Sequence, residues 1–458
     1  MTWFHKLLPS LAVGVALCSA PIARAEEAKK ASTEERLDVV EVKQGDAVVK
    51  GDIPGSFRIP GSEVSLRLYG YAELNWIHAF NNDNTGEDYA SFAPYLPLED
   101  SDEAERGGRN YFTARESRIG LEAGMPTKYG VMSVKLEGDF NNEPRRGNSS
   151  TYGSAANVYT QLLSNSYGFR LRHAYGKFGG LLVGQTWSTF MDVDNLPETV
   201  DFNGPVGGTF IRQPQIRYSY GTLKAGTFTA AIENSVTHLL GPGDVLAVSS
   251  SRMPDLVLRW DRSFGFGGLS IRAMTQELRL KGQFTEVVDD TVYPNVTVTH
   301  DADAAKRGYG VAASGTIKTR GSDFLTFGVT YGTGIGRYMY YVEGAAYDAA
   351  NDEIVLETAV GGYVGYQLKA SDVLRFNLAY GILYELDSDY TEFAEAEGFD
   401  SGRYGVNRLV QQAHAGFFYS PVKATDFGLE GIYGARKTLA DEKGSEFRLN
   451  FLARFYVN

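Results

Sequence analysis

Apolar and polar side chains alternate one by one along most of the chain from residue 64 onward. In the first such stretch one parity is mostly apolar and the other mostly polar; the apolar positions are Val64, Leu66, Leu68, Ala72, Leu74, Trp76 and Phe80. Successive side chains of a β-strand point to opposite faces, so this period of two predicts a strand with one oily face and one polar face. An amphipathic helix would repeat every three to four residues instead.

The same alternation recurs as far as the C-terminal end of the chain. Three further examples are Met132, Val134, Leu136 and Phe140 against Ser133, Lys135, Glu137 and Asp139; Phe169, Leu171 and Tyr175 against Arg170 and Arg172; and Phe447, Leu449, Phe451, Ala453 and Phe455 against Arg448, Asn450 and Arg454. Counting all such segments gives about sixteen strands.

The connections between these segments tend to alternate between short and long. Residues 124–130 and 221–226 are short connections, whereas residues 81–108, 141–168 and 188–212 are long ones. Outer-membrane barrels have short turns on the periplasmic side and long loops outside, while a β-sandwich or propeller has no reason to alternate in this way. The pattern therefore predicts an all-β fold, a transmembrane antiparallel β-barrel whose oily face meets lipid and whose polar face lines water.

Composition removes several other classes of protein. The formal net charge of -12 makes a basic nucleic-acid binder improbable on electrostatic grounds, and a single cysteine cannot form an internal disulfide. A polytopic helical membrane protein is excluded because no apolar run beyond residue 30 approaches the roughly 18 residues that a spanning helix needs.

The N-terminal residues predict export. Lys6 precedes an apolar stretch, and Ala23-Arg24-Ala25 forms a small-residue cleavage site, which together are typical of a secretory signal peptide at residues 1–25. Residues 26–62 are charged and are expected to form a periplasmic extension, and residues 63–458 the barrel. We therefore expect the general secretory route and insertion into the outer membrane of a Gram-negative cell.

Several segments resemble a known porin family. The stretch GSFRIPGSEVSLRLYGYAELNWIHAF from Gly55 and the run FTARESRIGLEAG from Phe112 resemble outer-membrane porins. The segment FRLRHAYGKFGGLLVGQTWSTFMDVDNLPETVDFNGP from Phe169 and FIRQPQIRY from Phe210 are similar to the DcaP-type trimeric porins, a family implicated in uptake of dicarboxylates and other small organic acids. The resemblance implies a sixteen-stranded homotrimeric barrel with an inward-folded third loop.

Charged residues indicate how such a channel would select solutes. The resemblance places the constriction loop within residues 188–212, which carry Asp192, Asp194, Glu198 and Asp201. The polar parity of the neighbouring strands supplies a basic ladder of Arg67, Arg118, Arg170, Arg172, Arg217, Arg259, Arg272, Arg448 and Arg454. Acids facing arginines across a narrow neck create a transverse field that favours carboxylates. The alternative is that these arginines neutralise lumen acids such as Glu73, Glu122, Glu137, Asp139 and Glu430.

The chain carries no recognisable catalytic or metal motif. The five histidines beyond the signal peptide lie in neither a G-x-S-x-G nor an H-E-x-x-H setting. Acidic loops such as 99–103 could attract calcium, but no EF-hand loop is present, and such loops are usually solvated. We therefore expect no enzyme, no cofactor and no metal.

The sequence predicts a passive porin for small hydrophilic solutes that prefers carboxylates and dicarboxylates. A non-selective sieve and a structural or adhesive barrel remain as alternatives. The expected partners are small anionic organic solutes, outer-membrane lipid and lipopolysaccharide, the barrel-assembly machinery and two further copies of the chain, with no nucleic acid.

Overall fold

The computed structural model describes residues 49–82, 90–142, 167–243, 245–289, 296–339 and 342–457. The expected signal peptide (1–25) and residues 26–48 of the expected extension lie outside the described residues. The chain divides into two compact units, residues 1–67 and residues 68–458, and each is described by itself.

The described part of the first unit is a small antiparallel arrangement of strands. Strand β1 (Val49–Lys50) pairs with β2 (Phe57–Arg58), and β2 pairs with the first residues of β3 (Ser65–Ala79). The turn between β1 and β2 is held by Asp52, whose carboxylate lies 3.0 Å from the Arg58 guanidinium. Gly55 supplies the positive φ of 78° that this turn requires.

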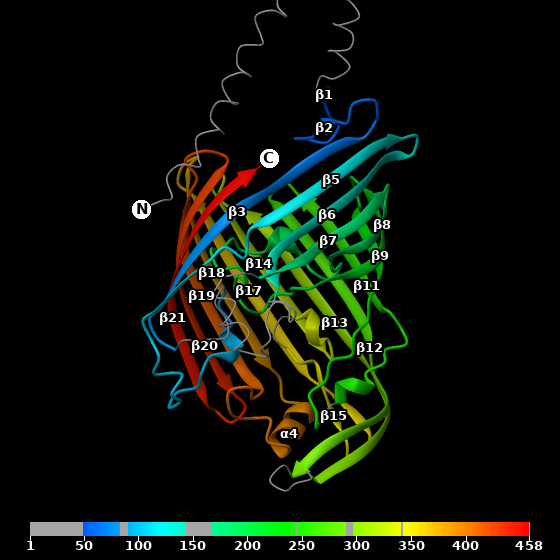
Figure 1. Cartoon of the computed structure of the whole chain (residues 1–458), viewed down its shortest axis with the longest axis vertical. Coiled ribbons are helices and arrows are strands. Elements are labelled where there is room, and N and C mark those ends of the chain that lie inside the picture. The colour runs from blue at the N-terminus through cyan, green and yellow to red at the C-terminus, as the bar shows by residue number, and fades with distance from the viewer. Residues whose placement is uncertain are drawn as a thin grey trace, which may run out of the picture. The chain divides into compact units, whose positions relative to one another are not determined.

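The second unit is a closed antiparallel β-barrel (Figure 1). Nineteen strands hydrogen-bond to one another; without β1 and β2, and with β4 (Arg109–Thr113) and β5 (Arg118–Thr127) taken as one interrupted strand, the barrel has sixteen. The others are β3, β6 (Gly130–Asn142), β7 (Gly168–Phe178), β8 (Leu181–Trp187), β9 (Arg212–Thr222), β10 (Gly226–Glu233), β11 (Asp255–Phe264), β12 (Gly267–Asp289), β13 (Val296–Lys318), β14 (Phe324–Thr333), β17 (Thr358–Lys369), β18 (Leu374–Glu385), β19 (Asn407–Tyr419), β20 (Thr425–Thr438) and β21 (Lys443–Val457). The last strand, β21, pairs with β3 from Arg448↔Ala79 to Val457↔Gly70, which closes the sheet. The predicted fold class and strand number are confirmed.

The outer face of the barrel is apolar, as the alternation predicted. Met132, Val134, Leu136 and Phe140 of β6 are all at least 40% exposed, and Leu258 of β11 is 62% exposed. Their polar sequence neighbours Glu137 and Asp139 are buried on the inner face. An exposed apolar belt around a closed barrel is the surface that a bilayer covers.

One predicted face is wrong, because a β-bulge shifts the parity of β7. The register between β6 and β7 slips at Glu137/Gly138, so that Arg172 and His173 together oppose the space of one residue. Tyr175 then stands directly opposite Lys135, on the inner face, rather than beside Leu171 on the outer one. Period-two patterns cannot reveal such an extra residue, because each half of the strand still alternates.

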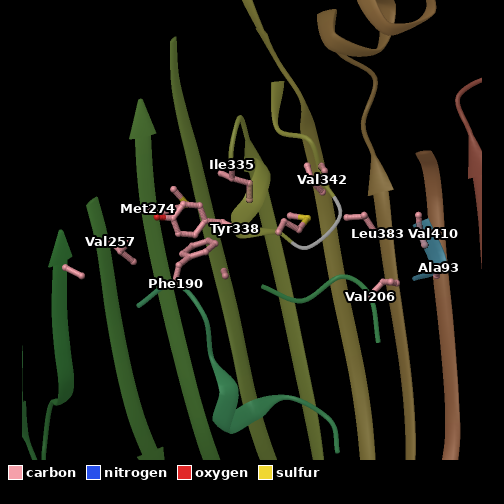
Figure 2. Close-up of a cluster of buried hydrophobic side chains, with 14 of the residues drawn as sticks. Ala93, Phe190, Val206, Val257, Met274, Ile335, Tyr338, Val342, Leu383 and Val410 are labelled. Atoms are coloured by element: carbon pink, nitrogen blue, oxygen red, sulfur yellow. The ribbon is translucent and has the colours of Figure 1, made fainter. Parts of the chain in front are cut away.

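The inner face also carries an apolar layer that the alternation did not predict. Inward residues of seven strands form it: Ala231, Val257, Met274, Ala312, Ala359, Leu383 and Val410. Three segments between strands pack onto this layer, through Ala93, through Phe190 and Val206, and through Ile335 and Tyr338 (Figure 2). Burying a side chain such as Phe190, Val206 or Ile335 contributes about 1.5–3 kcal/mol to stability. Apolar contacts, and not ion pairs alone, therefore hold these segments against the barrel wall.

The strands β12 and β13 continue beyond their barrel neighbours as a two-stranded ribbon (Figure 1). Each has 23 residues, but β12 pairs with β11 only as far as Thr275, and β13 with β14 only from Tyr309. The hairpin of β15 (Ala345–Asp348) and β16 (Glu353–Leu356) contributes Tyr347 and Ile354 to an apolar cluster with this ribbon. The longest helix among the described residues is α4 (Asp389–Ala396), and no described helix is long and apolar enough to cross a membrane.

The lipid-facing assignment leads to a testable prediction. Replacing Leu258 with arginine should lower the free energy of unfolding by about 2–4 kcal/mol, because a charge then faces the hydrocarbon near mid-strand. Urea titration of the protein folded into phospholipid vesicles, followed by tryptophan fluorescence, measures the change. Leu223→Arg is the matched control, since Leu223 is fully exposed in the β9–β10 turn. Equal effects at the two leucines would contradict the assignment.

Candidate functional site

The segment between β8 and β9, residues 188–211, leaves the sheet at a buried carboxylate. The side chain of Glu233 accepts hydrogen bonds from the Ser188 hydroxyl and from the backbone N–H of Thr189, both at 2.7 Å. Further along, Gly204 and Gly207 adopt positive φ values of 66° and 89°. A Cβ on Gly207 would approach the Ile382 carbonyl oxygen within 2.2 Å, so this glycine allows the segment to lie directly against β18.

Acidic residues of this segment bind directly to inner-face side chains. Asp192 lies 3.2 Å from the Arg259 guanidinium of β11 and also accepts a hydrogen bond from Ser314 of β13. Glu198 forms a two-pronged pair with Arg375 of β18, with both N–O distances at 2.7 Å. Parallel N–H···O bonds of this kind fix the orientation as well as the position of the carboxylate.

The tip of the segment is held by a buried polar network. Glu430 of β20 accepts the backbone N–H groups of Val200 and Asp201, both at 3.0 Å. Asp201 in turn accepts the N–H of Ser91 at 2.8 Å and the amide of Asn450 at 3.1 Å. The 90–97 segment is thereby tied to the 188–211 segment, although 110 residues separate the two partners.

The pKa values of Asp192 and Asp201 are shifted in opposite directions. Both residues lie outside the strands. Burial raises the pKa of Asp201 to about 6, against the opposing charges of His414 and Arg448. Burial also disfavours the charged form of Asp192, but Arg259 and the hydrogen bonds from Ser314 and Asn195 outweigh it, so the pKa of Asp192 lies below its usual value. Asp194, the fourth predicted acid, is exposed on the short 3₁₀ turn Val193–Asn195 and forms no ion pair among the described residues.

A second charged group, which we call the arginine cluster, is formed by residues of β5, β6 and β7 and by the first residue of β9. It comprises Arg118, Lys135, Arg170, Arg172 and Arg212, and the acids among them are Glu122, Glu137 and Asp139. Arg170 lies 2.8 Å from Asp139, and Arg172 bridges Glu137 at 3.0 Å and Asp139 at 2.9 Å. Glu137 also lies 3.6 Å from Arg118 and 3.5 Å from Lys135. Arg115 and Glu116 border the cluster and add one charge of each sign, so six cations against four carboxylates leave an excess of two positive charges.

Aromatic rings surround the arginine cluster. Trp187 at the end of β8 packs edge-on against Phe210, and Phe210 against Phe202, with centroid distances of 5.1 and 6.4 Å. The Arg170 guanidinium lies over the Phe202 ring at 5.6 Å, and that of Arg212 over Trp187 at 4.4 Å. Phe202 and Phe210 belong to the 188–211 segment, so this segment contacts the cluster through rings rather than through its acids.

Three other arginines of the predicted ladder form a second group, because Arg259 and Arg272 are direct partners in the register of β11 and β12 and Arg217 lies near Arg259. Arg272 bonds to the Phe190 carbonyl oxygen and to Ser314, and Arg448 lies 3.5 Å from Glu446. Arg454 pairs with Glu73 at 2.5 Å. Arg217 is half-buried on β9, and Arg67 belongs to the first unit, where it packs against Gly55. The structure therefore brings together Arg118, Arg170 and Arg172 in one group and Arg217, Arg259 and Arg272 in another, and it pairs most of the ladder with carboxylates.

Two arginines that bind or border the 188–211 segment were not included in the predicted ladder. Arg375 lies on the polar parity with Asn377 but was left out, and Arg212, the first residue of β9, shares the parity of the apolar Ile216. The apolar inner layer did leave a signal, because Leu256, Val257 and Leu258 form an uninterrupted apolar run that indicates a strand covered on both faces.

Comparisons with known proteins agree with this architecture. A closed sixteen-stranded barrel with a charged interior is the architecture of porin-type channels of the outer membrane. Residues 58–457 match the model of the DcaP outer membrane protein family, and the chain belongs to this family. The protein is therefore an outer-membrane channel. No curated protein sequence matches the chain at a significant level.

One solved structure shares this fold, and two others have TM-scores below 0.5. The outer membrane channel DcaP of Acinetobacter baumannii is 22% identical, with a TM-score of 0.67, covering 90% of this chain and 100% of that chain. The trimer form of OmpT from Vibrio cholerae is 14% identical, with a TM-score of 0.48, covering 86% and 100%. The anion-selective porin from Comamonas acidovorans is also 14% identical, with a TM-score of 0.47 and the same coverage.

The attachment of the 188–211 segment can be tested at Asp192. Asp192→Asn should lower the free energy of unfolding by about 1–3 kcal/mol at pH 7, because Arg259 then loses a charged partner in a buried site. Since the pKa of Asp192 is lowered in the folded protein, this contribution is present at neutral pH and is lost as the pH falls below about 4. Urea titrations at pH 7 and pH 3.5 measure it. A difference between wild type and variant that persists undiminished at the lower pH would contradict the assignment.

Proposed function

We propose that the protein is a passive diffusion channel that favours small organic anions, with carboxylates and dicarboxylates as its preferred solutes. The observation that carries the proposal is the excess of positive charge in the arginine cluster. Fixed charges on a narrow aqueous path raise the local concentration of the opposite ion. Guanidinium groups also match the planar, two-oxygen geometry of a carboxylate.

We propose that the 188–211 segment has a different role from the one that its acids suggested. Asp192, Glu198 and Asp201 are bound by Arg259, Arg375 and the polar network around Glu430, so their charges are largely compensated. We propose that this segment narrows the lumen as a folded-in loop and leaves the arginine cluster as the main source of the field along the solute path. The transverse field then comes from one side of the neck.

Passage itself needs no cofactor and no covalent chemistry. A solute carboxylate exchanges water for guanidinium contacts at several points, each weak enough that release stays fast. Assembly as a homotrimer, contact with lipopolysaccharide, folding by the barrel-assembly machinery and export by the secretory route stay predictions from the sequence.

The proposal is tested by the selectivity of single variants in planar bilayers. In a KCl gradient the wild type should give a reversal potential whose sign shows that chloride permeates more readily than potassium. Arg170→Gln should lower the anion-to-cation permeability ratio by about twofold, and Glu122→Gln should raise it by about the same factor, since each changes one fixed charge near the path. A four-carbon dicarboxylate should reduce the chloride current of the wild type more than that of Arg170→Gln.

Arg262→Gln is the matched control. Arg262 is an exposed arginine near the C-terminal end of β11, and it does not belong to the arginine cluster. It should leave the ratio unchanged. A wild type with no ion preference would make the protein a non-selective sieve, and a wild type with no conductance would make it a structural or adhesive barrel. Either result overturns the proposal.

A further inference from the structure

Arg212 differs from the other arginines of the cluster in its partners. Arg118, Arg170 and Arg172 each lie within ion-pair distance of Glu137 or Asp139. Among the described residues no carboxylate lies within that distance of Arg212, and its buried Nη1 atom has no hydrogen-bond partner. The charged groups that act on it most strongly are Arg172 and Arg170, and Asp139 follows from beyond ion-pair distance.

The contact that Arg212 does make is with an aromatic face. Its guanidinium lies 4.4 Å from the centroid of the Trp187 ring, and the two residues are direct partners in the register of β8 and β9. The Arg172 guanidinium approaches the same ring at 5.7 Å. Two guanidinium groups therefore share one indole.

The indole is itself fixed from the side. Phe210 packs against it edge-on at 5.1 Å, and His173 packs edge-on at 5.9 Å. His173 is held by a 2.9 Å contact between its Nδ1 and the Thr186 hydroxyl. The ring that supports Arg212 thus has a defined orientation, set by β7, β8 and the 188–211 segment.

An aromatic face and a carboxylate hold a guanidinium in different ways. A carboxylate cancels the charge and occupies the N–H donors. The negative face of an aromatic ring attracts the cation, and most strongly when the ring is tryptophan, but it leaves the net charge in place and the in-plane N–H donors unused. Holding several arginines close together without neutralising them therefore requires rings rather than acids.

We propose that Trp187 is a positioning residue that holds Arg212 as an uncompensated guanidinium, and that Arg212 together with Arg172 forms a subsite for one carboxylate of a passing anion. This inference rests on the proposed anion preference and names the residues that dominate it. Arg212 contacts the solute, and Trp187 acts only through the orientation of Arg212.

Permeability ratios and dicarboxylate block in planar bilayers test the subsite. Arg212→Gln and Trp187→Leu should each lower the anion-to-cation permeability ratio by about twofold and raise the half-blocking dicarboxylate concentration by about threefold. Trp187→Phe should give intermediate values, because a smaller ring attracts the cation less strongly. In the Arg212→Gln background, Trp187→Leu should have no further effect on the ratio.

A second variant keeps the charge and so does not depend on whether Trp187→Leu assembles. Arg212→Lys should also lower the ratio, because an ammonium on a flexible stem does not lie flat on the ring or offer two parallel donors. The controls are Trp260→Leu, which removes a tryptophan from β11 outside the cluster, and Arg262→Gln, which removes an arginine that lies 5.1 Å from the Phe264 ring. Both should leave the ratio and the block unchanged.

These outcomes distinguish a failure of the proposed subsite from a failure of the proposed function. If Arg212→Gln leaves the ratio and the block unchanged in an anion-selective wild type, the subsite is wrong. If Arg212→Gln lowers the permeability ratio and weakens the dicarboxylate block, but Trp187→Leu and Arg212→Lys do neither, the positioning role of the Trp187 ring is wrong. A wild type without anion preference would defeat the proposed function itself, and the inference with it.

Discussion

The pairing of β21 with β3 is the interaction on which the rest of the second unit depends. Their register runs without interruption from Arg448↔Ala79 to Val457↔Gly70, so the last strand satisfies the backbone groups of the first. An open edge in hydrocarbon would leave N–H and C=O groups without partners, at a cost of several kcal/mol each. Closure therefore allows the outer face to be apolar and gives the inner face a space shielded from lipid.

That enclosed space accommodates two different kinds of contact. The 90–97, 188–211 and 335–339 segments rest on the apolar layer around Met274 and Leu383, while ion pairs such as Glu198–Arg375 set their orientation. On β5 to β9, guanidinium groups gather around Glu137, Asp139 and the Trp187 ring. Compensated charges thus serve attachment, and in the proposed function the partly compensated ones face the solute path.

The fold could be predicted from the sequence because its determinant is local. The alternation at Met132–Phe140 states which side chains meet lipid without reference to any distant residue, and the exposure of Met132 and Leu136 agrees with it. The site could be predicted only in part. Glu198 meets Arg375, 177 positions away, and Ser91 meets Asp201, 110 positions away; nothing near either residue specifies these partners. Arg212 was missed because its distinguishing property is the lack of a carboxylate within ion-pair distance among the described residues. Residue spacing in the sequence does not reveal such a property.

The apolar layer behind the 188–211 segment determines which properties of the channel depend on ionic strength. Charge-based attraction along the solute path fades as salt rises, since the screening length falls from about 10 Å at 0.1 M to about 3 Å at 1 M. Contacts such as Phe190 with Tyr338 and Met274 do not depend on ionic strength in this way. At high salt the channel should therefore keep its internal dimensions while the proposed preference for anions weakens, so that selection by size persists when selection by charge is lost.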